Sequence, residues 1–430
     1  MTIVGSGRGR VGSTSRRYAI FVLTALTAMN HVDRQLISIL LEPVRVEFQL
    51  SDIKLGLLSG IAFAALFSAL SVPAAVWAVR HSRRNLIAAA AALWGVMTVL
   101  CGLSQTYWQL ILARTGVGIG EAGGMAPSQA IISEMHPPGE RATAQGALSA
   151  GINAGTFVSF VMGGYVGQRY GWRAAFLGAG VLTVALALLL RLTVREPERL
   201  IGNVRDTAMV QPSGSIVRDT LRAMWVDPVL RQLCIGAALT AAVAAGTAAW
   251  APSYLARSHK MGIAAIGLYL ALVLGLGGAL GTWLGGLWSD RLRRRDVRWS
   301  LWLVAVVSMA TKPLSIGFYL AADTRAALLL FLLPGMTTAV FLGPSIAVLH
   351  ERVSPHQQPV ASAMLALVMS LVGMGLGPLF VGVMSEWLFA VHGESSLRYA
   401  LVVLQIAGIW GALHFYVAGR HLAPARGVTA

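Results

Sequence analysis

Long apolar runs dominate this chain, and they predict an all-helical membrane protein. A helix needs about 20 mostly apolar residues to cross a bilayer. Twelve stretches of the sequence meet this requirement, and charged residues make up only 12% of the chain, against about 25% in soluble proteins. The twelve predicted transmembrane helices cover residues 17–41, 53–79, 85–104, 107–133, 142–168, 172–194, 229–256, 262–289, 299–321, 326–350, 359–386 and 397–419.

One long polar connection divides the predicted spans into two sets of six. We therefore predict an N-terminal six-helix bundle over residues 17–194, a cytoplasmic linker over 195–228 and a C-terminal six-helix bundle over 229–420. Between Ile216 and Trp225 of the linker, apolar residues recur at helical spacing. This pattern predicts a short amphipathic helix on the membrane surface.

Basic residues are distributed unevenly between the two sets of loops. The termini and the loops on their side hold 23 Lys and Arg residues, whereas the opposite loops hold 8. This bias predicts an integral protein of the cytoplasmic (inner) membrane with both termini in the cytoplasm. The net charge of +16 does not indicate nucleic acid, because the basic residues cluster in short loops rather than along one soluble face.

Four charged residues lie deep inside the first and fourth predicted spans, where a charge costs about 2.5–3.5 kcal/mol. They are Asp33 and Arg34 in the first span, and Arg114 and Glu121 in the fourth. At about 1.5 Å of rise per helical residue, Asp33 and Arg114 reach similar depths and Glu121 lies nearer the middle. We expect Arg114 to pair with ionised Asp33. Because burial disfavours a charged carboxylate, we expect Glu121 to take up a proton readily.

This cluster favours proton coupling, in which two carboxylates near one guanidinium exchange protons as a cavity opens to either side. The alternatives are a fixed ion-pair network that clamps two helices, or sodium coupling. Arg34 either contacts an anionic substrate or takes part in packing or an ion pair. Lys312, in the ninth span, either meets an anionic headgroup or extends towards the outer surface, and we favour the second interpretation.

Few other polar residues fall within the spans. Asn153, Thr156, Trp250 and Tyr254 are candidates for the wall of a substrate cavity, and ordinary helix packing is the alternative for each. A cavity with few hydrogen-bonding groups favours an amphipathic cargo, such as a lysophospholipid or a related lipid, over a sugar. The sequence shows no nucleophile–base pair, metal cluster or soluble catalytic domain, so we predict no enzyme activity, no metal and no cofactor apart from protons as the coupling ion.

The two halves also repeat a short motif at a shift of 211 residues, in the loop after the second span of each half. Parallel six-span repeats are typical of one large transporter architecture. The shift superposes Trp77 on Trp288, Arg80 on Arg291, Arg83 on Arg294 and Arg84 on Arg295.

The second copy, Gly286-x-x-x-Asp290-Arg291-x-x-Arg294-Arg295, resembles the signature loop of the major facilitator superfamily. Two further stretches resemble its spinster-type branch, whose members are proposed lipid or lysolipid transporters. They are Asp33-Arg34-Gln35-Leu36 leading into Leu41-Glu42-Pro43, and Arg114 through Glu121 to Pro127-Ser128. The resemblance covers about residues 17–420 and implies the major facilitator fold. It also implies a cytoplasmic gate formed by Asp290, Arg291, Arg294, Arg295, Arg80, Arg83 and Arg84.

These observations predict a proton-coupled secondary active transporter that moves an amphipathic lipid-like substrate by alternating access and works as a monomer in the bilayer. A proton-coupled transporter of drugs or organic anions is the alternative. A membrane receptor or scaffold that transports nothing is a third possibility, but it would not need two bundles related by a repeat.

One departure from the family pattern predicts a weaker cytoplasmic gate. Val79 stands where the family normally carries an Asp that holds the cytoplasmic side shut. We expect Val79→Asp to raise the outward-facing population, because it restores the missing anion of the first-half loop. A distance measurement across the cytoplasmic ends of the helices checks this, and unchanged distances would contradict it.

Overall fold

The computed structural model describes residues 13–137, 139–196 and 214–422, and every regular element within them is a helix. The N-terminal helix group comprises α1 (Ser13–Phe48), α2 (Asp52–Ser59), α3 (Ile61–Arg80), α4 (Arg83–Leu103), α5 (Tyr107–Glu121), α6 (Met125–Met135) and α7 (Arg141–Thr193). The helix α9 (Gly214–Val226) follows in the linker. The C-terminal helix group comprises α10 (Pro228–His259), α11 (Ile263–Leu270), η2 (Ala271–Gly277), α12 (Gly278–Arg293), α13 (Trp299–Leu320), α14 (Thr324–Met336), α15 (Leu342–Arg352), α16 (Gln358–Val368), η3 (Met369–Leu376), α17 (Gly377–His392), η4 (Gly393–Ser395) and α18 (Ser396–His421).

Seven helical stretches of the described chain are long and apolar enough to cross a membrane. Two of them, residues 143–193 and 358–421, hold 51 and 64 residues, well beyond the length that one crossing needs. Inside α7, Gly171 has a φ of 84°, which breaks the helix between the predicted fifth and sixth spans. The all-helical membrane fold is therefore confirmed, and the number of twelve crossings stays a prediction.

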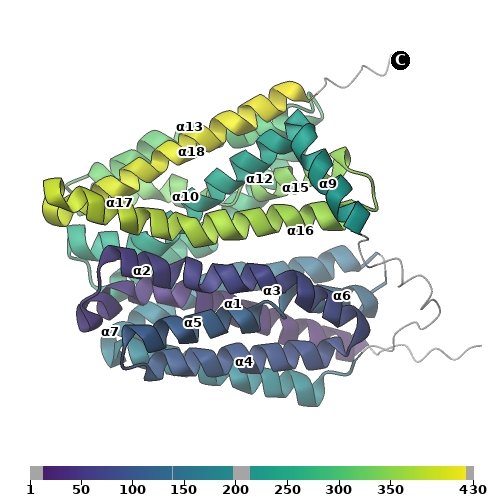
Figure 1. Ribbon diagram of the computed structural model, residues 1–430, viewed down its shortest axis with the longest axis horizontal. Helices are drawn as coiled ribbons and strands as arrows, with labels where there is room; N and C mark the ends of the chain where they lie inside the picture. Colours follow the sequence, from purple (N-terminus) through teal and green to yellow (C-terminus); the bar gives the residue numbers. More distant parts are fainter. Residues whose placement is uncertain (1–12, 138, 197–213, 423–430) are drawn as a thin grey trace, which may run out of the picture.

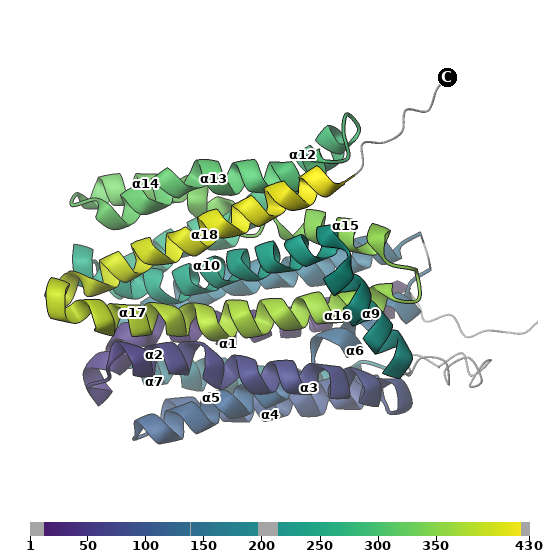
Figure 2. The ribbon, with the colours of Figure 1, turned by 45° about the horizontal axis from the view of Figure 1, so that its top comes forward.

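The two helix groups lie side by side, and the axes of most long helices are roughly aligned with the long axis of the molecule (Figures 1 and 2). In the N-terminal group α1 and α4 pack on α7, and in the C-terminal group α10 and α13 pack on α18. One apolar core extends through both groups, and a second lies within α9 and the C-terminal group. Large apolar side chains are also exposed on the outside, among them Leu192 and Val391, as expected of helices that face acyl chains.

The described residues begin with Ser13 and finish with Leu422 at the same end of the molecule, which we call the terminal end. There Arg16 of α1 contacts Glu140 just before α7, and Arg298 just before α13 donates to the carbonyl oxygen of Leu422. The helices α6 and α9 lie at the same end (Figure 1). We call the opposite end, which holds α2 and the junction of α17 with α18, the distal end.

The two groups repeat one another in their helices as well as in the loop motif. The helices α2 and α11 both have 8 residues, and α6 and α15 both have 11. A shift of 217 residues superposes α6 on α15 and aligns Pro127, Ser128 and Glu134 with Pro344, Ser345 and Glu351. Equivalent positions of the two groups can therefore be compared directly.

Two glycines let α5 approach its neighbours closely. A Cβ atom on Gly118 would lie 2.6 Å from the carbonyl oxygen of Phe63 in α3, and one on Gly120 would lie 2.6 Å from the backbone nitrogen of Trp94 in α4. Both distances are shorter than any ordinary contact with a Cβ atom. The helix α5 can therefore lie this close to α3 and α4 only because these two positions carry no side chain. Small residues serve this purpose generally in membrane helices, where packing drives association.

We expect Gly118→Ala to destabilise the fold, because the new methyl group meets backbone that cannot move aside. The expected loss is about 1–3 kcal/mol, which a thermal unfolding measurement in detergent detects as a lower Tm. Gly178→Ala is the matched control, since a Cβ atom there meets nothing within 4 Å. Equal melting temperatures for the two variants would contradict this account of the α3–α5 contact.

Candidate functional site

The four charged residues inside the first and fourth predicted spans meet in one buried cluster. Asp33 and Arg34 lie on α1, and Arg114 and Glu121 lie on α5. Asp33 is 0% exposed, and Arg114 and Glu121 are each 1% exposed. The side chain of Arg34 is the most open, at 17%. The structure thus brings together the residues that the sequence singled out.

The ion pair within the cluster is formed by Arg34. Arg34 donates from Nε to Oε2 of Glu121 at 2.7 Å, whereas Arg114 donates from Nη1 to the backbone carbonyl oxygen of Asp33 at 3.2 Å. Arg114 thus reaches Asp33 through the backbone in this conformation, and its pairing with an ionised Asp33 carboxylate stays a prediction. Arg34, which follows Asp33 by about 100° around α1, faces Glu121.

Several polar atoms of this cluster are buried without a hydrogen-bond partner. They are both carboxyl oxygens of Asp33, Oε1 of Glu121 and Nε of Arg114. The hydroxyl of nearby Thr98 is already used, because it donates to the carbonyl oxygen of Trp94 at 2.9 Å. Each buried polar group left unpaired costs about 1–3 kcal/mol. A network that served only to clamp two helices would be expected to satisfy these atoms.

Aromatic rings and a methionine complete the surroundings of Arg34. Its guanidinium lies 4.4 Å from the ring centre of Phe67 and 5.1 Å from that of Phe63, both on α3. Its Nη1 also lies 4.0 Å from the sulfur of Met374 on η3. Arg34 therefore touches both helix groups. Sequence reasoning missed Phe63, Phe67 and Met374, because apolar residues in apolar runs give no signal.

The predicted cavity residues are placed in helix packing. Trp250 and Tyr254 are both 0% exposed. Trp250 donates to the carbonyl oxygen of Pro378 at 2.9 Å, and the Tyr254 hydroxyl donates to that of Phe318 at 2.8 Å. These bonds use the polar atoms that would otherwise face a substrate, so neither residue is part of a cavity wall in this conformation.

On α7, Asn153 and Thr156 are half-buried. The Thr156 hydroxyl donates to the carbonyl oxygen of Ile152, one turn earlier in its own helix, at 3.0 Å. The structure gives neither residue a contact with the charged cluster. Their role as cavity residues stays a prediction.

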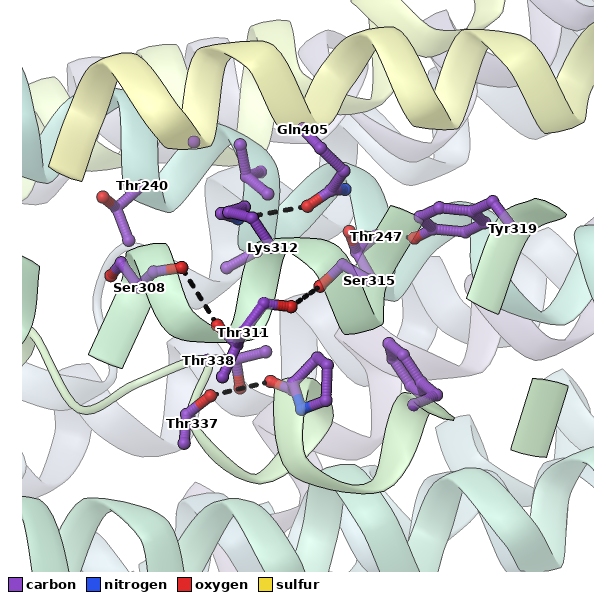
Figure 3. A pocket seen from close by; sticks show the side chains of 15 residues that line it. Thr240, Thr247, Ser308, Thr311, Lys312, Ser315, Tyr319, Thr337, Thr338 and Gln405 are labelled. Atoms are coloured by element: carbon purple, nitrogen blue, oxygen red, sulfur yellow. Dashed lines mark hydrogen bonds between the residues drawn. The ribbon is translucent and has the colours of Figure 1, made fainter. Parts of the chain in front are cut away.

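The favoured prediction that Lys312 extends towards the outer surface is wrong, because its side chain turns into the C-terminal group. Its Nζ donates to Oε1 of Gln405 at 3.1 Å. Around it lies a polar cavity of about 50 Å³, enclosed by α10, α13, α14 and α18 (Figure 3). Lys312 lies in the middle of its predicted span and is separate from the α1–α5 cluster.

At the terminal end, each helix group has an ion pair between an arginine within the repeated motif and a glutamate. In the N-terminal group, Arg83 forms an ion pair with Glu134, and the backbone N–H groups of Arg83 and Arg84 donate to Glu196 at 2.7 and 3.1 Å. In the C-terminal group, Arg293 pairs with Glu351, the residue equivalent to Glu134.

The other motif residues of the C-terminal group are open to the surroundings: Asp290, Arg291, Arg294 and Arg295 are exposed. The side chains of Val79 and Arg80 lie outside those that the structure describes. A latch across the terminal end therefore stays a prediction.

At the distal end, a charged network joins the two groups. Arg257 at the end of α10 donates from Nε to Oε2 of Glu42 at 2.7 Å, and from both Nη atoms to the Asp52 carboxylate at 2.8 and 3.0 Å. The Ser385 hydroxyl of α17 donates to Asp52 at 2.6 Å. We call Glu42, Asp52, Arg257 and Ser385 the distal clasp. The guanidinium meets the Asp52 carboxylate in the two-pronged geometry that makes such pairs strong.

The distal clasp is reinforced by backbone contacts between α2 and α17. The N–H of Ile53 donates to Glu386 at 2.8 Å, and a Cβ atom on Gly382 would lie 2.3 Å from the carbonyl oxygen of Asp52. The described structure is therefore closed at the distal end. Sequence reasoning did not identify the clasp, because Arg257 and Asp52 lie 205 residues apart.

The described residues offer no group of three His, Cys, Asp or Glu side chains placed to bind one metal ion.

A helical membrane protein of two repeated groups, with charges buried inside one of them and a clasp between them, has the features of a secondary transporter. Residues 23–378 match the family description Major Facilitator Superfamily. The chain belongs to the Major Facilitator Superfamily.

Individual relatives indicate which branch of the superfamily the chain resembles. It is 31% identical over 404 residues to a protein of Mycolicibacterium smegmatis named "MFS-type efflux pump", covering 93% of this chain and 92% of the relative. It is 25% identical to the Arabidopsis thaliana "Probable sphingolipid transporter spinster homolog 2", covering 85% of this chain and 77% of the relative. The resemblance to spinster-type transporters is thus confirmed.

Crystal structures of a bacterial homologue of the human lysosomal transporter Spinster, in two inward-facing conformations, share this fold. The occupied form superposes with a TM-score of 0.82 at 27% identity, and the unoccupied form with a TM-score of 0.83 at 26% identity. Each comparison covers 96% of this chain and 98% of the other.

We expect Arg257→Leu to shift the protein towards a conformation open at the distal end. Hydrogen bonds to charged groups contribute about 1.5–3 kcal/mol each, so losing them changes the ratio of conformations by about tenfold or more. Spin labels on exposed Gln105 and Arg325, one in each group, report the distance across the distal end. A longer distance in the variant is the expected result.

The control for that measurement is Arg173→Leu. Arg173 also lies at the distal end and also binds a carboxylate, that of Glu47 at 2.6 Å, but both residues belong to the N-terminal group. Its loss is expected to leave the distance between the groups unchanged. The same distance in Arg257→Leu and the wild type would show that the clasp does not hold this end closed.

Proposed function

We propose that this transporter is a proton-coupled secondary active transporter that moves an amphipathic, lipid-like substrate by alternating access. The observation that supports it most is the buried cluster on α1 and α5. Its carboxyl oxygens are partly unpartnered, and its Arg34 touches both helix groups. Ionisable residues enclosed in a membrane protein commonly serve proton relays and substrate paths.

In the proposed cycle, residues 17–194 and 229–420 form two six-helix bundles of a twelve-span protein, and they rock against each other around the cluster. The excess of basic residues at the terminal end supports a cytoplasmic location for both termini. With the distal clasp closed and the second motif exposed, the described conformation then faces the cytoplasm. The similarity to two inward-facing crystal structures supports the same assignment.

Proton movement follows from the unequal partners of the two carboxyl groups. An ionised carboxylate without hydrogen-bond partners is costly inside a protein, which makes Asp33 the proposed proton-binding group of α1. Glu121 forms an ion pair with Arg34 at 2.7 Å. When Glu121 takes up a proton, that pair breaks and the Arg34 guanidinium becomes available to the other helix group. Proton binding on α5 is in this way linked to the contact between the groups.

The cargo is proposed from the chemistry around the cluster and from the relatives. Phe63, Phe67 and Met374 offer apolar surface beside the Arg34 guanidinium, which suits a molecule with a charged head and an apolar tail. The name of the Arabidopsis relative points to a lipid of this kind. No cofactor is required, and we propose that the protein works as a monomer in the lipid bilayer of the inner membrane.

Export of apolar drugs is the second candidate function. The Mycolicibacterium smegmatis relative named as an efflux pump supports it, because that similarity spans nearly the whole of both chains. Both candidates use the same proton-coupled cycle. They differ in whether the cargo carries a polar headgroup.

Transport into vesicles tests the coupling and the cargo together. A difference of one pH unit supplies about 1.4 kcal/mol per proton, enough for about tenfold accumulation. We expect an imposed pH gradient to drive lysophosphatidylcholine across proteoliposomes containing the wild type. Accumulation of ethidium but not of the lysolipid would favour drug export, and transport rates that ignore the gradient would contradict proton coupling.

The variant Asp33→Asn is expected to lose the response to the pH gradient while it keeps exchange of labelled for unlabelled substrate. The amide has nearly the shape of the protonated acid, so the buried site stays filled but binds no proton. Glu47→Gln is the control, because Glu47 is a carboxylate outside the cluster. Gradient-driven accumulation by Asp33→Asn at the wild-type level would show that Asp33 does not carry the coupled proton.

A further inference from the structure

The polar cavity of the C-terminal helix group lies where the charged cluster lies in the N-terminal group. The 217-residue shift that aligns α6 with α15 also aligns Glu121 with Thr338 and Arg114 with Phe331. Both Thr338 and Phe331 line the cavity. Aligning the prolines inside α1 and α10, Pro43 and Pro252, places Arg34 on Val243, which lines it as well.

The N-terminal cluster and the C-terminal cavity differ in the charged groups that they contain. The N-terminal cluster holds two guanidinium groups and two carboxyl groups, and one pair of them forms an ion pair. The C-terminal cavity holds the ammonium group of Lys312, and its 15 lining residues include no Asp or Glu. An enclosed charge without a counter-charge costs several kcal/mol. Either the amine gives up its proton or a negative charge comes from outside the protein. The hydrogen-bond donors of the cavity favour the second alternative.

The cavity has the hydrogen-bond donors that such an anion needs. An ammonium group has three N–H donors, and Gln405 takes one from Lys312 at 3.1 Å. The buried hydroxyl of Thr240, another lining residue, has no hydrogen-bond partner. The opening of about 50 Å³ holds about three or four waters, or one small oxyanion in their place.

A glycine on α18 makes room for the ammonium group. A Cβ atom on Gly408 would lie 2.4 Å from Nζ of Lys312, so any larger residue would displace the charge. Gly408 and Gln405, both on α18, therefore position Lys312 towards the cavity instead of towards lipid. Figure 3 shows Lys312 and Gln405 meeting above the ring of hydroxyl side chains.

We propose that the cavity around Lys312 binds an oxyanion, either a carboxylate or a phosphate group. The oxyanion accepts hydrogen bonds from Lys312 and Thr240 and neutralises the enclosed charge. It is either the head of an amphipathic molecule or a free ion. The proposal builds on the proposed transport function, since it names the headgroup class of the cargo, but binding to this site does not require transport.

The lysine content of the chain allows a direct test. Lys54, Lys260 and Lys312 are the three lysines of the sequence. In full-length protein labelled with [6-13C]lysine in phosphatidylcholine nanodiscs, NMR therefore observes three side chains, and Lys312→Gln identifies the signal of Lys312. Dodecyl phosphate, dodecanoate and inorganic phosphate are titrated in turn, with neutral dodecyl maltoside as the control.

The expected result is a saturable shift of the Lys312 signal with an oxyanion, while Lys54, Lys260 and the maltoside titration show none. A shift with dodecyl phosphate or dodecanoate alone identifies the head of an amphiphile, and a shift with inorganic phosphate as well identifies a site for free oxyanions. Both results support the proposal. A Lys312 signal that none of the three oxyanions moves would overturn it.

A second variant tests the site while Lys312 is kept. Gly408→Ala places a methyl group against the ammonium group and is expected to weaken dodecyl phosphate binding about tenfold or more by calorimetry, a loss of about 1.4 kcal/mol. Gly278→Ala is the control, because a Cβ atom there meets nothing within 4 Å. Unchanged affinity in Gly408→Ala would contradict the assigned site.

The outcome is independent of the transport assay. Oxyanion binding at Lys312 in a protein that ignores a pH gradient would refute proton coupling and leave the site standing. Gradient-driven transport by a protein whose Lys312 signal never moves would refute the site and leave the coupling standing.

Discussion

The cost of enclosing charge in a medium that cannot hydrate it is the constraint on which the rest of this structure depends. Charged side chains are buried in few places, and their partners come from several helices. Arg34 has a carboxylate, two aromatic rings and a sulfur atom around it, contributed by α5, α3 and η3. A residue with so many neighbours responds to any rearrangement of the helices that carry them.

The two halves share one repeated arrangement of helices but differ in the charged residues that they enclose. In the N-terminal group, acids and guanidinium groups lie together, and Arg34 and Glu121 form an ion pair between α1 and α5. In the C-terminal group, Thr338 and Val243 occupy the equivalent places, and a single ammonium group is left. The repeat explains why polar sites occur at matching places, and the substitutions explain why the two sites differ in charge.

Contact between the groups combines charge with close backbone packing. At the distal end, Arg257 links α10 to carboxylates of α1 and α2, and Gly382 lets α17 lie directly against Asp52. Ion pairs can break and form again, and close helix contacts guide them back to the same geometry. At the terminal end, Asp290 and its basic neighbours are exposed. This difference between the ends defines the conformation that the structure describes.

The sequence by itself determined the class of fold, the repeat and the members of the buried cluster. Apolar runs of span length are unmistakable, and a charge such as Asp33 within one is rare enough to identify a site. Only the tertiary structure decided the partners. Whether Arg34 or Arg114 meets Glu121 depends on how α1 is rotated against α5, and whether Lys312 turns inwards depends on space left by Gly408 on another helix. Arg257 and Asp52 do not stand out in the sequence, and Glu42 stands out only through a family resemblance that names no partner. Charges near the ends of spans are common, and their pairing is fixed only when distant segments fold together.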